Sequence, residues 1–466
     1  MKKFIVTLLI YALPQIILSL FKVENKETYG IIISTIILWM SEYLALAYTS
    51  LLIPLVAAFL GIMSFKEALQ SFAHPILFLF IACFFLSIAF NRSGLDRRIS
   101  LIILKTSFFS KNSTRLLVSV SLLSWLLSMW ISNTAACAIL IPILLGLSKD
   151  DSINLGENLL KKLLISCAYA ASIGGLCTPV GSPPNLLALD TLSKLGHEIS
   201  FVKWIAISLP ISLLMLVALL LILNVIFKEE KTQIDCAVFK DQFKELGKIS
   251  QRELITLLSF GLCVLFWIFP TMLLKLGVID HKLTLAQAGL LGTIPLFVFS
   301  LKQTGSPLLE WQQVQKSLDW GIIFLFAGGL TLGHIMDSTG VAATIASYIF
   351  NDQSNVLLLG IIVTFFGIIL SELGSNTASA ALILPLLGAL SSNSAMGDSI
   401  VFLTLCATFG ASFGFMLPVS TPPNALAFST GKLKIRDLVT AGIFFDILGL
   451  IVISGVLYGL LKVQLI

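Results

Sequence analysis

Residues 132–142 read SNTAACAILIP and residues 375–385 read SNTASAALILP, so one short polar motif opens two apolar stretches that reach a proline. Seven of the thirteen positions are identical between residues 132–144 and 375–387. A match of this quality within one chain indicates an internal repeat.

A second matched pair follows each copy in the same order. Residues 179–185 read PVGSPPN, and residues 418–424 read PVSTPPN. Upstream, residues 76–95 match residues 322–341 more weakly. The repeat unit is therefore one apolar span, a polar-tipped stretch, and a span broken at Pro-Pro-Asn.

The composition identifies the class of protein. The chain of 466 residues is 57% hydrophobic and 12% charged, whereas a soluble domain carries about 25% charged residues. This excludes a cytosolic enzyme, a secreted disulfide scaffold and a disordered protein. Neither the net charge of +5 nor the seven cysteines, which form no CxxC, indicates nucleic-acid binding or a zinc site.

The apolar runs predict about eleven membrane-spanning helices, since about 20 apolar residues cross one bilayer. Two further stretches, 115–146 and 355–390, are too long for one span and too interrupted for two. We predict that they form two re-entrant hairpins with the Ser-Asn-Thr motifs at their tips. The predicted fold class is an all-α polytopic membrane protein whose hairpins belong to an inverted repeat.

Loop charges predict the orientation. With a cytoplasmic N-terminus, 22 of the 30 Lys and Arg residues lie on the inner side, as the positive-inside rule requires. We therefore expect a multi-pass protein of a cell (inner) membrane, surrounded by lipid. Residues 94–110 and 338–352 are predicted as short interfacial helices, because they are mixed rather than uniformly apolar.

The repeat divides the chain into five predicted parts. These are N-terminal scaffold spans (1–74), a first repeat with hairpin and broken helix (75–202), scaffold spans with a cytoplasmic connector (203–318), a second inverted repeat (319–436), and a C-terminal span (437–466). Inverted repeats with broken helices are typical of secondary transporters, whose binding site lies at the repeat interface.

The residue types at the tips predict ion binding. Ser, Thr and Asn are neutral donors and acceptors. A helix broken within the membrane leaves free N–H groups, which attract anions, and free carbonyls, which suit Na⁺. The motifs contain no Lys or Arg, so a bound anion needs co-bound cations to balance its charge.

Ionisable residues within or near the apolar segments are compatible with other functions. Glu372, just before the second tip, is a functional candidate or a structural partner. A membrane enzyme using Glu372 and His334 is an alternative, but no pair of nucleophile and base recurs in the repeat. A channel is a third possibility, although two hairpins do not resemble a continuous pore lining.

The motifs resemble those of the divalent anion/sodium symporter family, which carries di- and tricarboxylates or sulfate. The resemblance rests on Ser132-Asn133-Thr134, Ser375-Asn376-Thr377 and the two Pro-Pro-Asn motifs, and it covers about residues 30–460. It implies a homodimer with a scaffold domain and a mobile transport domain that moves as an elevator. One departure is Ala136, where many members have a hydroxyl.

The resemblance also implies two sets of binding residues. The sodium ions would meet Ser128, Ser132, Asn133 and Gly181 at one site, and Ser371, Gly374, Asn376 and Ser420 at the other. The substrate would meet Ser132, Asn133, Thr134, Ser182, Ser375, Asn376, Thr377, Thr421 and Pro422.

The sequence therefore predicts a symporter that imports C4-dicarboxylates such as succinate, malate and fumarate together with Na⁺, and that is not an enzyme. A sodium/sulfate symporter and a dicarboxylate exchanger on the same scaffold remain open at this point.

Overall fold

The computed structural model describes residues 2–106, 112–147, 156–228, 237–277, 283–341, 344–345, 355–389 and 399–466. In these ranges the chain is helical, with one isolated β-bridge between Ser300 and Pro307. The helices are α1 Lys2–Leu20, α2 Lys26–Ser41, α3 Leu46–Phe59, α4 Phe65–Ala68, a 3₁₀ turn Gln70–Ala73, α5 Pro75–Ser93, α6 Leu95–Leu104, α8 Ser113–Ser128, α9 Asn133–Leu147, α10 Glu157–Gly174, α11 Pro183–Lys194, α12 Phe201–Ile226, α13 Ala237–Glu245, α14 Gln251–Ile268, α15 Pro270–Lys275, α16 Leu285–Val298, α17 Trp311–Ser317, α18 Trp320–Ser338, α20 Val356–Leu373, α21 Asn376–Ala389, α22 Ser399–Ala411, α23 Pro422–Ser429 and α24 Ile435–Lys462.

Length and hydropathy support the membrane class. Within the described ranges, six helical segments are long and apolar enough to cross a bilayer, and further apolar helices of 10 to 17 residues accompany them. The multi-pass helical class is thus confirmed. The count of about eleven spans and the re-entrant course of the hairpins stay predictions.

Both repeats fold into the same sequence of elements. In the first, α8 and α9 meet at the Ser-Asn-Thr tip, and α10 is followed by an unwound segment, residues 175–182, before α11. In the second, α20 and α21 meet at the other tip, and residues 412–421 separate α22 from α23. Pro183 and Pro422 are the first residues of α11 and α23, because proline at a helix start loses no intrahelical hydrogen bond.

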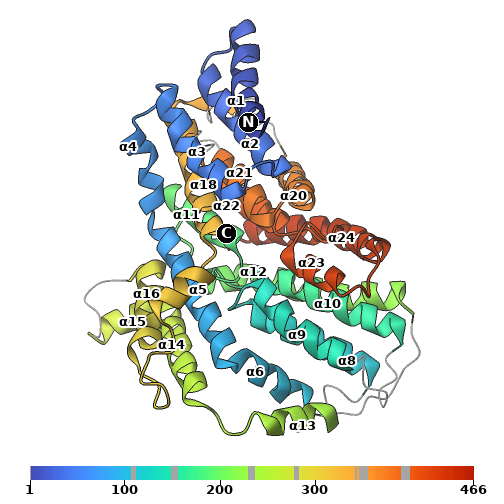
Figure 1. Ribbon diagram of the computed structural model, residues 1–466. Coiled ribbons are helices and arrows are strands. Elements are labelled where there is room, and N and C mark those ends of the chain that lie inside the picture. Colours follow the sequence, from blue (N-terminus) through green and yellow to red (C-terminus); the bar gives the residue numbers. More distant parts are fainter. Residues whose placement is uncertain are drawn as a thin grey trace.

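The helices pack as two groups. We call α8–α12 and α20–α24 the binding half, because α8 packs on α10, α20 on α22 and α24, and α12 on α24. We call α2–α5 and α14–α18 the scaffold half, in which α3 packs on α18 and α16 on α5 and α14. In Figure 1, α8–α10, α23 and α24 lie at the right of the view, while α14–α16 lie at the lower left. The two halves meet where α18 packs on α21.

A glycine corner begins the predicted interfacial segment. Gly94 has φ 74° and ends α5, so the chain turns directly into α6. The helix α6 shows that part of the predicted segment 94–110 is helical, and its interfacial location stays a prediction. The predicted segment 338–352 lies mostly outside the described residues.

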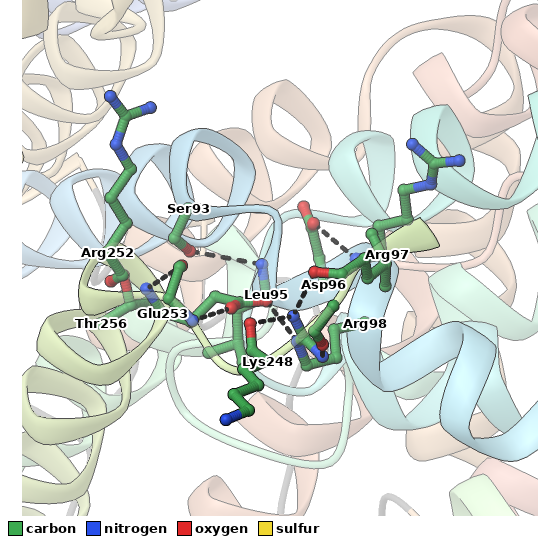
Figure 2. A network of polar contacts seen from close by, with 12 residues as sticks. Ser93, Leu95, Asp96, Arg97, Arg98, Lys248, Arg252, Glu253 and Thr256 are labelled. Atoms are coloured by element: carbon green, nitrogen blue, oxygen red, sulfur yellow. Dashed lines mark hydrogen bonds and ion pairs between the residues drawn. The ribbon is translucent and has the colours of Figure 1, made fainter. Parts of the chain in front are cut away.

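A buried arginine fixes α6 to the connector between the repeats. The Arg98 guanidinium donates to the Glu253 carboxylate at 2.5 Å and to the Gly247 carbonyl at 3.0 Å, and Figure 2 shows it lying between the two segments. Glu253 in turn accepts from the Ser250 backbone N–H at 2.6 Å, which completes a capping box at the start of α14. The start of α6 is therefore held by the scaffold half.

Candidate functional site

The two Ser-Asn-Thr tips line one cavity of about 440 Å³. Motifs that are 243 residues apart in the sequence thus face a common hollow. Its polar lining residues are Ser87, Ser132, Asn133, Thr134, Ser182, Asp319, Ser375, Asn376, Thr377, Ser420 and Thr421. Every substrate residue that the sequence predicted therefore lines this cavity, together with Pro422.

Each tip is the N-terminus of a helix that points away from the cavity. The Ser132 hydroxyl accepts from the Ala135 backbone N–H at 3.2 Å, and the Ser375 hydroxyl accepts from the Ala378 N–H at 3.1 Å. A helix N-terminus carries about half a positive charge on its unpaired N–H groups. Two such ends converge here, and their dipoles favour an anion between the tips; the described lining holds no Lys or Arg and includes the carboxylate of Asp319.

A buried serine fixes the amide oxygen of each tip asparagine. Ser128 Oγ donates to Asn133 Oδ1 at 2.5 Å, and Ser371 Oγ donates to Asn376 Oδ1 at 2.7 Å. Both serines are fully buried. The same donor and acceptor therefore recur at the same spacing in both repeats, and each holds an oxygen at the edge of the cavity.

The asparagines of the Pro-Pro-Asn motifs hold the unwound segments. Asn185 Nδ2 donates to the carbonyls of Gly175 at 2.7 Å and Thr178 at 2.8 Å. Asn424 Nδ2 does the same to Gly414 at 3.1 Å and Leu417 at 3.2 Å. No role was predicted for these two residues, although their place in a matched motif was the available signal.

Three glycines let the tips approach the unwound segments closely. A Cβ on Gly175 would lie 2.6 Å from Asn133 Oδ1, and one on Gly181 would lie 3.1 Å from the Ser128 carbonyl oxygen. A Cβ on Gly414 would lie 2.9 Å from Ser371 Oγ. Neutral carbonyl, hydroxyl and amide oxygens thus lie close together at two equivalent places, one in each repeat. Oxygens of this kind are the ligands that hard cations prefer.

The amide oxygens of Asn185 and Asn424 add to this picture. Both Oδ1 atoms are buried and have no hydrogen-bond partner within the described ranges. A buried acceptor without a partner is costly, and its recurrence in both repeats makes an accident of packing a poor explanation. An unpaired acceptor beside each unwound segment fits the expectation that cations occupy this region.

Glu372 has a structural role. Its carboxylate accepts from the backbone N–H groups of Met416 at 2.7 Å and Leu417 at 3.2 Å, and from the Ser420 hydroxyl at 2.6 Å. It therefore satisfies donors of the unwound segment and holds Ser420 in place. The cavity lining among the described residues includes Ser375 but not Glu372.

The remaining predicted residues lie close behind the cavity. Gly374 ends α20, where its N–H donates to the Leu370 carbonyl at 3.0 Å.

His334 lies 3.6 Å from Glu67, whereas Glu372 binds the unwound segment, so the structure does not join His334 and Glu372 in one site. The alternative of a membrane enzyme built on these two residues is wrong.

Comparison with protein families gives one match across most of the chain. A family described as "Citrate transporter" (CitMHS) matches residues 36–402. Among curated proteins, the chain is 33% identical over 456 residues to a protein of Haemophilus influenzae named "Uncharacterized transporter", covering 95% of this chain and 94% of that protein.

Two further relatives carry a more specific name. The chain is 32% identical over 465 residues to the sodium-dependent dicarboxylate transporter SdcS of Staphylococcus saprophyticus, covering 95% of this chain and 88% of that protein. It is also 32% identical over 444 residues to the protein of that name from Staphylococcus aureus, with coverages of 92% and 84%.

A solved structure has a similar fold. The YdaH transporter of Alcanivorax borkumensis superposes with a TM-score of 0.59, covering 86% of this chain and 88% of that chain. The sequence identity is 15%, so the likeness concerns the fold alone.

Proposed function

Because this chain belongs to the citrate transporter family, of the divalent anion/sodium symporter type, and is a multi-pass membrane transporter rather than an enzyme, we propose that it imports C4-dicarboxylates together with Na⁺. Succinate, malate and fumarate are the proposed substrates. The observation that carries this proposal is the meeting of two matched polar tips in one cavity.

The cavity suits a small dianion. A dicarboxylate has a negative group at each end, and the cavity has two helix N-termini, those of α9 and α21. We assign the carboxylates to the hydroxyls, amides and backbone of Ser132, Asn133, Thr134, Ser182, Ser375, Asn376, Thr377, Thr421 and Pro422.

The neutral oxygen clusters behind the tips are the proposed sodium sites. We assign one Na⁺ to Ser128, Ser132, Asn133 and Gly181, and a second to Ser371, Gly374, Asn376 and Ser420. Support comes from the crowding of oxygens around Gly175 and Gly414 and from the sodium dependence in the names of the relatives.

Charge balance favours coupling. Moving a dianion inward against the membrane potential costs about 4.6 kcal/mol per 100 mV, twice the value for one charge. Two Na⁺ ions cancel this term, and a third makes the potential favour uptake. A described cavity lining that contains the Asp319 carboxylate but no Lys or Arg leaves this task to the ions.

An elevator movement of the binding half against the scaffold half is the proposed mechanism. The contact between α18 and α21 is built from small residues: a Cβ on Gly329 would lie 3.0 Å from Ala381 Cβ, and one on Gly333 would lie 2.9 Å from Pro385 Cβ. Such a surface has few protruding side chains that oppose sliding. A homodimer of scaffold halves completes the proposal.

The proposed location is the cell inner membrane, with a cytoplasmic N-terminus. On that orientation the cavity faces the cytoplasm, because it is lined by Asp319, Gly321 and Ile322 at the start of α18, on the side to which the loop charges assign the cytoplasm.

Uptake by purified protein in liposomes tests the proposal. Radiolabelled succinate should accumulate when an inward Na⁺ gradient is imposed, and K⁺ in place of Na⁺ should abolish accumulation. Accumulation that is indifferent to Na⁺ would reject the coupling. Competition separates the rivals: sulfate that displaces succinate favours a sulfate carrier, whereas uptake that requires internal dicarboxylate and no ion gradient favours an exchanger.

A further inference from the structure

The cavity lies toward one face of the protein, which we call the Asp319 face. Its lining residues on α18 are Gly321, Ile322 and Leu325, from the first part of that helix. The end of α5 belongs to the same face, because Arg92 donates to Gln313, shortly before α18, at 2.6 Å.

The opposite face, which we call the His74 face, carries the start of α5 and the end of α18. Thr331 of α18 donates to the Ala68 carbonyl at 3.2 Å, and His334 lies 3.6 Å from Glu67. Both contacts join elements of the scaffold half. The cavity must open toward this face at some stage if substrate is to cross the membrane.

One contact on the His74 face joins the two halves. His74 Nε2 lies 3.2 Å from Asp190 Oδ1, and Asp190 Oδ2 lies 2.9 Å from Lys194 Nζ on the same helix, α11. Of the ion pairs between described residues, His74–Asp190 is the one that runs from the scaffold half to the binding half. The Asp190 side chain is 7% exposed, which makes its partners important.

The histidine needs no extra proton to make this contact. His74 Nδ1 accepts from the Ile76 backbone N–H at 3.4 Å, as the N-cap of α5. A ring that accepts at Nδ1 carries its proton at Nε2, and Nε2 faces Asp190. Neutral His74 is therefore already the donor, and it holds α5 and α11 together on the His74 face.

We propose that the His74–Asp190 contact is a latch that keeps the cavity closed toward the His74 face and that breaks in each transport cycle. This rests on the proposed function, because a latch of this kind has a role only in a protein that alternates between two openings. In the state described here the latch is closed and the cavity opens toward the Asp319 face.

A cysteine at position 180 can report the opening toward the His74 face. Val180 lines the cavity and is half-buried, whereas Val419, its counterpart in the second repeat, is 79% exposed. Because the two repeats are related by symmetry, we expect the side chain at position 180 to become as exposed as that of Val419 when the cavity opens toward the His74 face. Val180→Cys is made in a chain with Cys83→Ser and Cys236→Ser, and sealed vesicles are treated with a membrane-impermeant maleimide from each face separately.

Asp190→Ala, which removes the acceptor of the His74 Nε2–H, should raise the labelling rate from the His74 face by about tenfold. The labelling rate is proportional to the population of the state that is open toward the His74 face. A variant that raises this population therefore raises the labelling rate by the same factor. His74→Ala should have the same effect, and the double variant should add little, since both remove one interaction. Lys194→Met, which leaves His74–Asp190 intact, and Glu67→Gln, which breaks a pair inside the scaffold half, are the matched controls and should leave the rate within twofold.

Labelling from the His74 face that stays unchanged in both Asp190→Ala and His74→Ala would overturn the latch. Sodium-driven succinate uptake is measured in the same vesicles: uptake that persists with unchanged labelling rejects the latch alone, and uptake that is absent from the unaltered protein rejects the proposed function. If either variant does not fold, His74→Cys with Asp190→Cys replaces it. In a chain that keeps Val180, bridging that pair with Hg²⁺ should stop sodium-driven succinate uptake until a thiol is added, and continued uptake by the bridged protein would reject the proposal.

Discussion

Replacement of Gly175 by alanine tests the proposed first sodium site. The new Cβ would lie 2.6 Å from Asn133 Oδ1 and 3.2 Å from the Gly181 carbonyl oxygen, well inside van der Waals contact. Both neighbours are held in place, Asn133 by Ser128 and Gly181 by the unwound segment. Relief of the clash must therefore displace an oxygen that we assign to Na⁺.

Overpacking of a well-packed site costs about 1–3 kcal/mol, which corresponds to roughly a 5- to 150-fold change in an equilibrium constant. We expect the sodium concentration for half-maximal succinate uptake to rise by a factor in this range. Sodium-dependent thermal stabilisation of the purified protein should shift to higher sodium concentration by a similar factor, which measures binding without transport.

Gly146→Ala is the matched control, because it lies on α9 of the same hairpin and its Cβ would meet no atom within 4 Å. It should leave the sodium dependence unchanged. The reasoning is refuted if folded Gly175→Ala keeps a half-maximal sodium concentration within twofold of the unaltered protein, or if Gly146→Ala shifts it equally.

Three further predictions concern residues outside the cavity lining. Glu372→Ala should abolish uptake and lower thermal stability, because the backbone donors of Met416 and Leu417 lose their acceptor; full uptake by this variant would contradict the assigned role. Arg98→Ala should reduce the free energy of unfolding by about 3–5 kcal/mol, because Glu253 would remain buried without its partner; a melting temperature equal to that of Arg97→Ala, whose guanidinium is not part of this network, would argue against it. Burial raises the pKa of Asp96 on α6, outside the candidate spans, to about 6. The folded state therefore binds a proton that the unfolded chain releases near pH 4, so this contribution to stability is greatest below about pH 4 and is lost as pH rises to about 6; Asp96→Asn should flatten the pH dependence of the melting temperature in that window, and an unchanged slope would count against the assignment.

The repeat made much of the site predictable from sequence. A polar motif within an apolar stretch is visible in the local sequence. Its second copy, followed in the same order by a second Pro-Pro-Asn motif, shows that the motif did not arise by chance. The spacing from Ser132 to Pro183 and from Ser375 to Pro422 therefore indicated two tips and two broken helices, and the structure places all four around one cavity.

The remaining features depend on tertiary contacts that leave no periodic signal. Glu372 could be read as a functional group or a structural partner until its acceptance of the Ser420 hydroxyl was seen. The pairing of His74 with Asp190 joins residues 116 positions apart without a motif at either end. The close approach of Gly175 to Asn133 could not be predicted from the sequence. A Gly-Gly pair is an ordinary signal for the end of a helix and does not indicate which side chain packs against it.

The absence of Lys and Arg from the described cavity lining has a thermodynamic consequence for a symporter. Where no fixed cation attracts the anion, the two kinds of cargo must raise each other's affinity, and by linkage they do so to the same extent in both directions. A carrier loaded with sodium alone, or with dicarboxylate alone, then holds its cargo loosely. Slippage of either species down its own gradient is thereby kept small, and the energy stored in the sodium gradient is not dissipated by futile cycling.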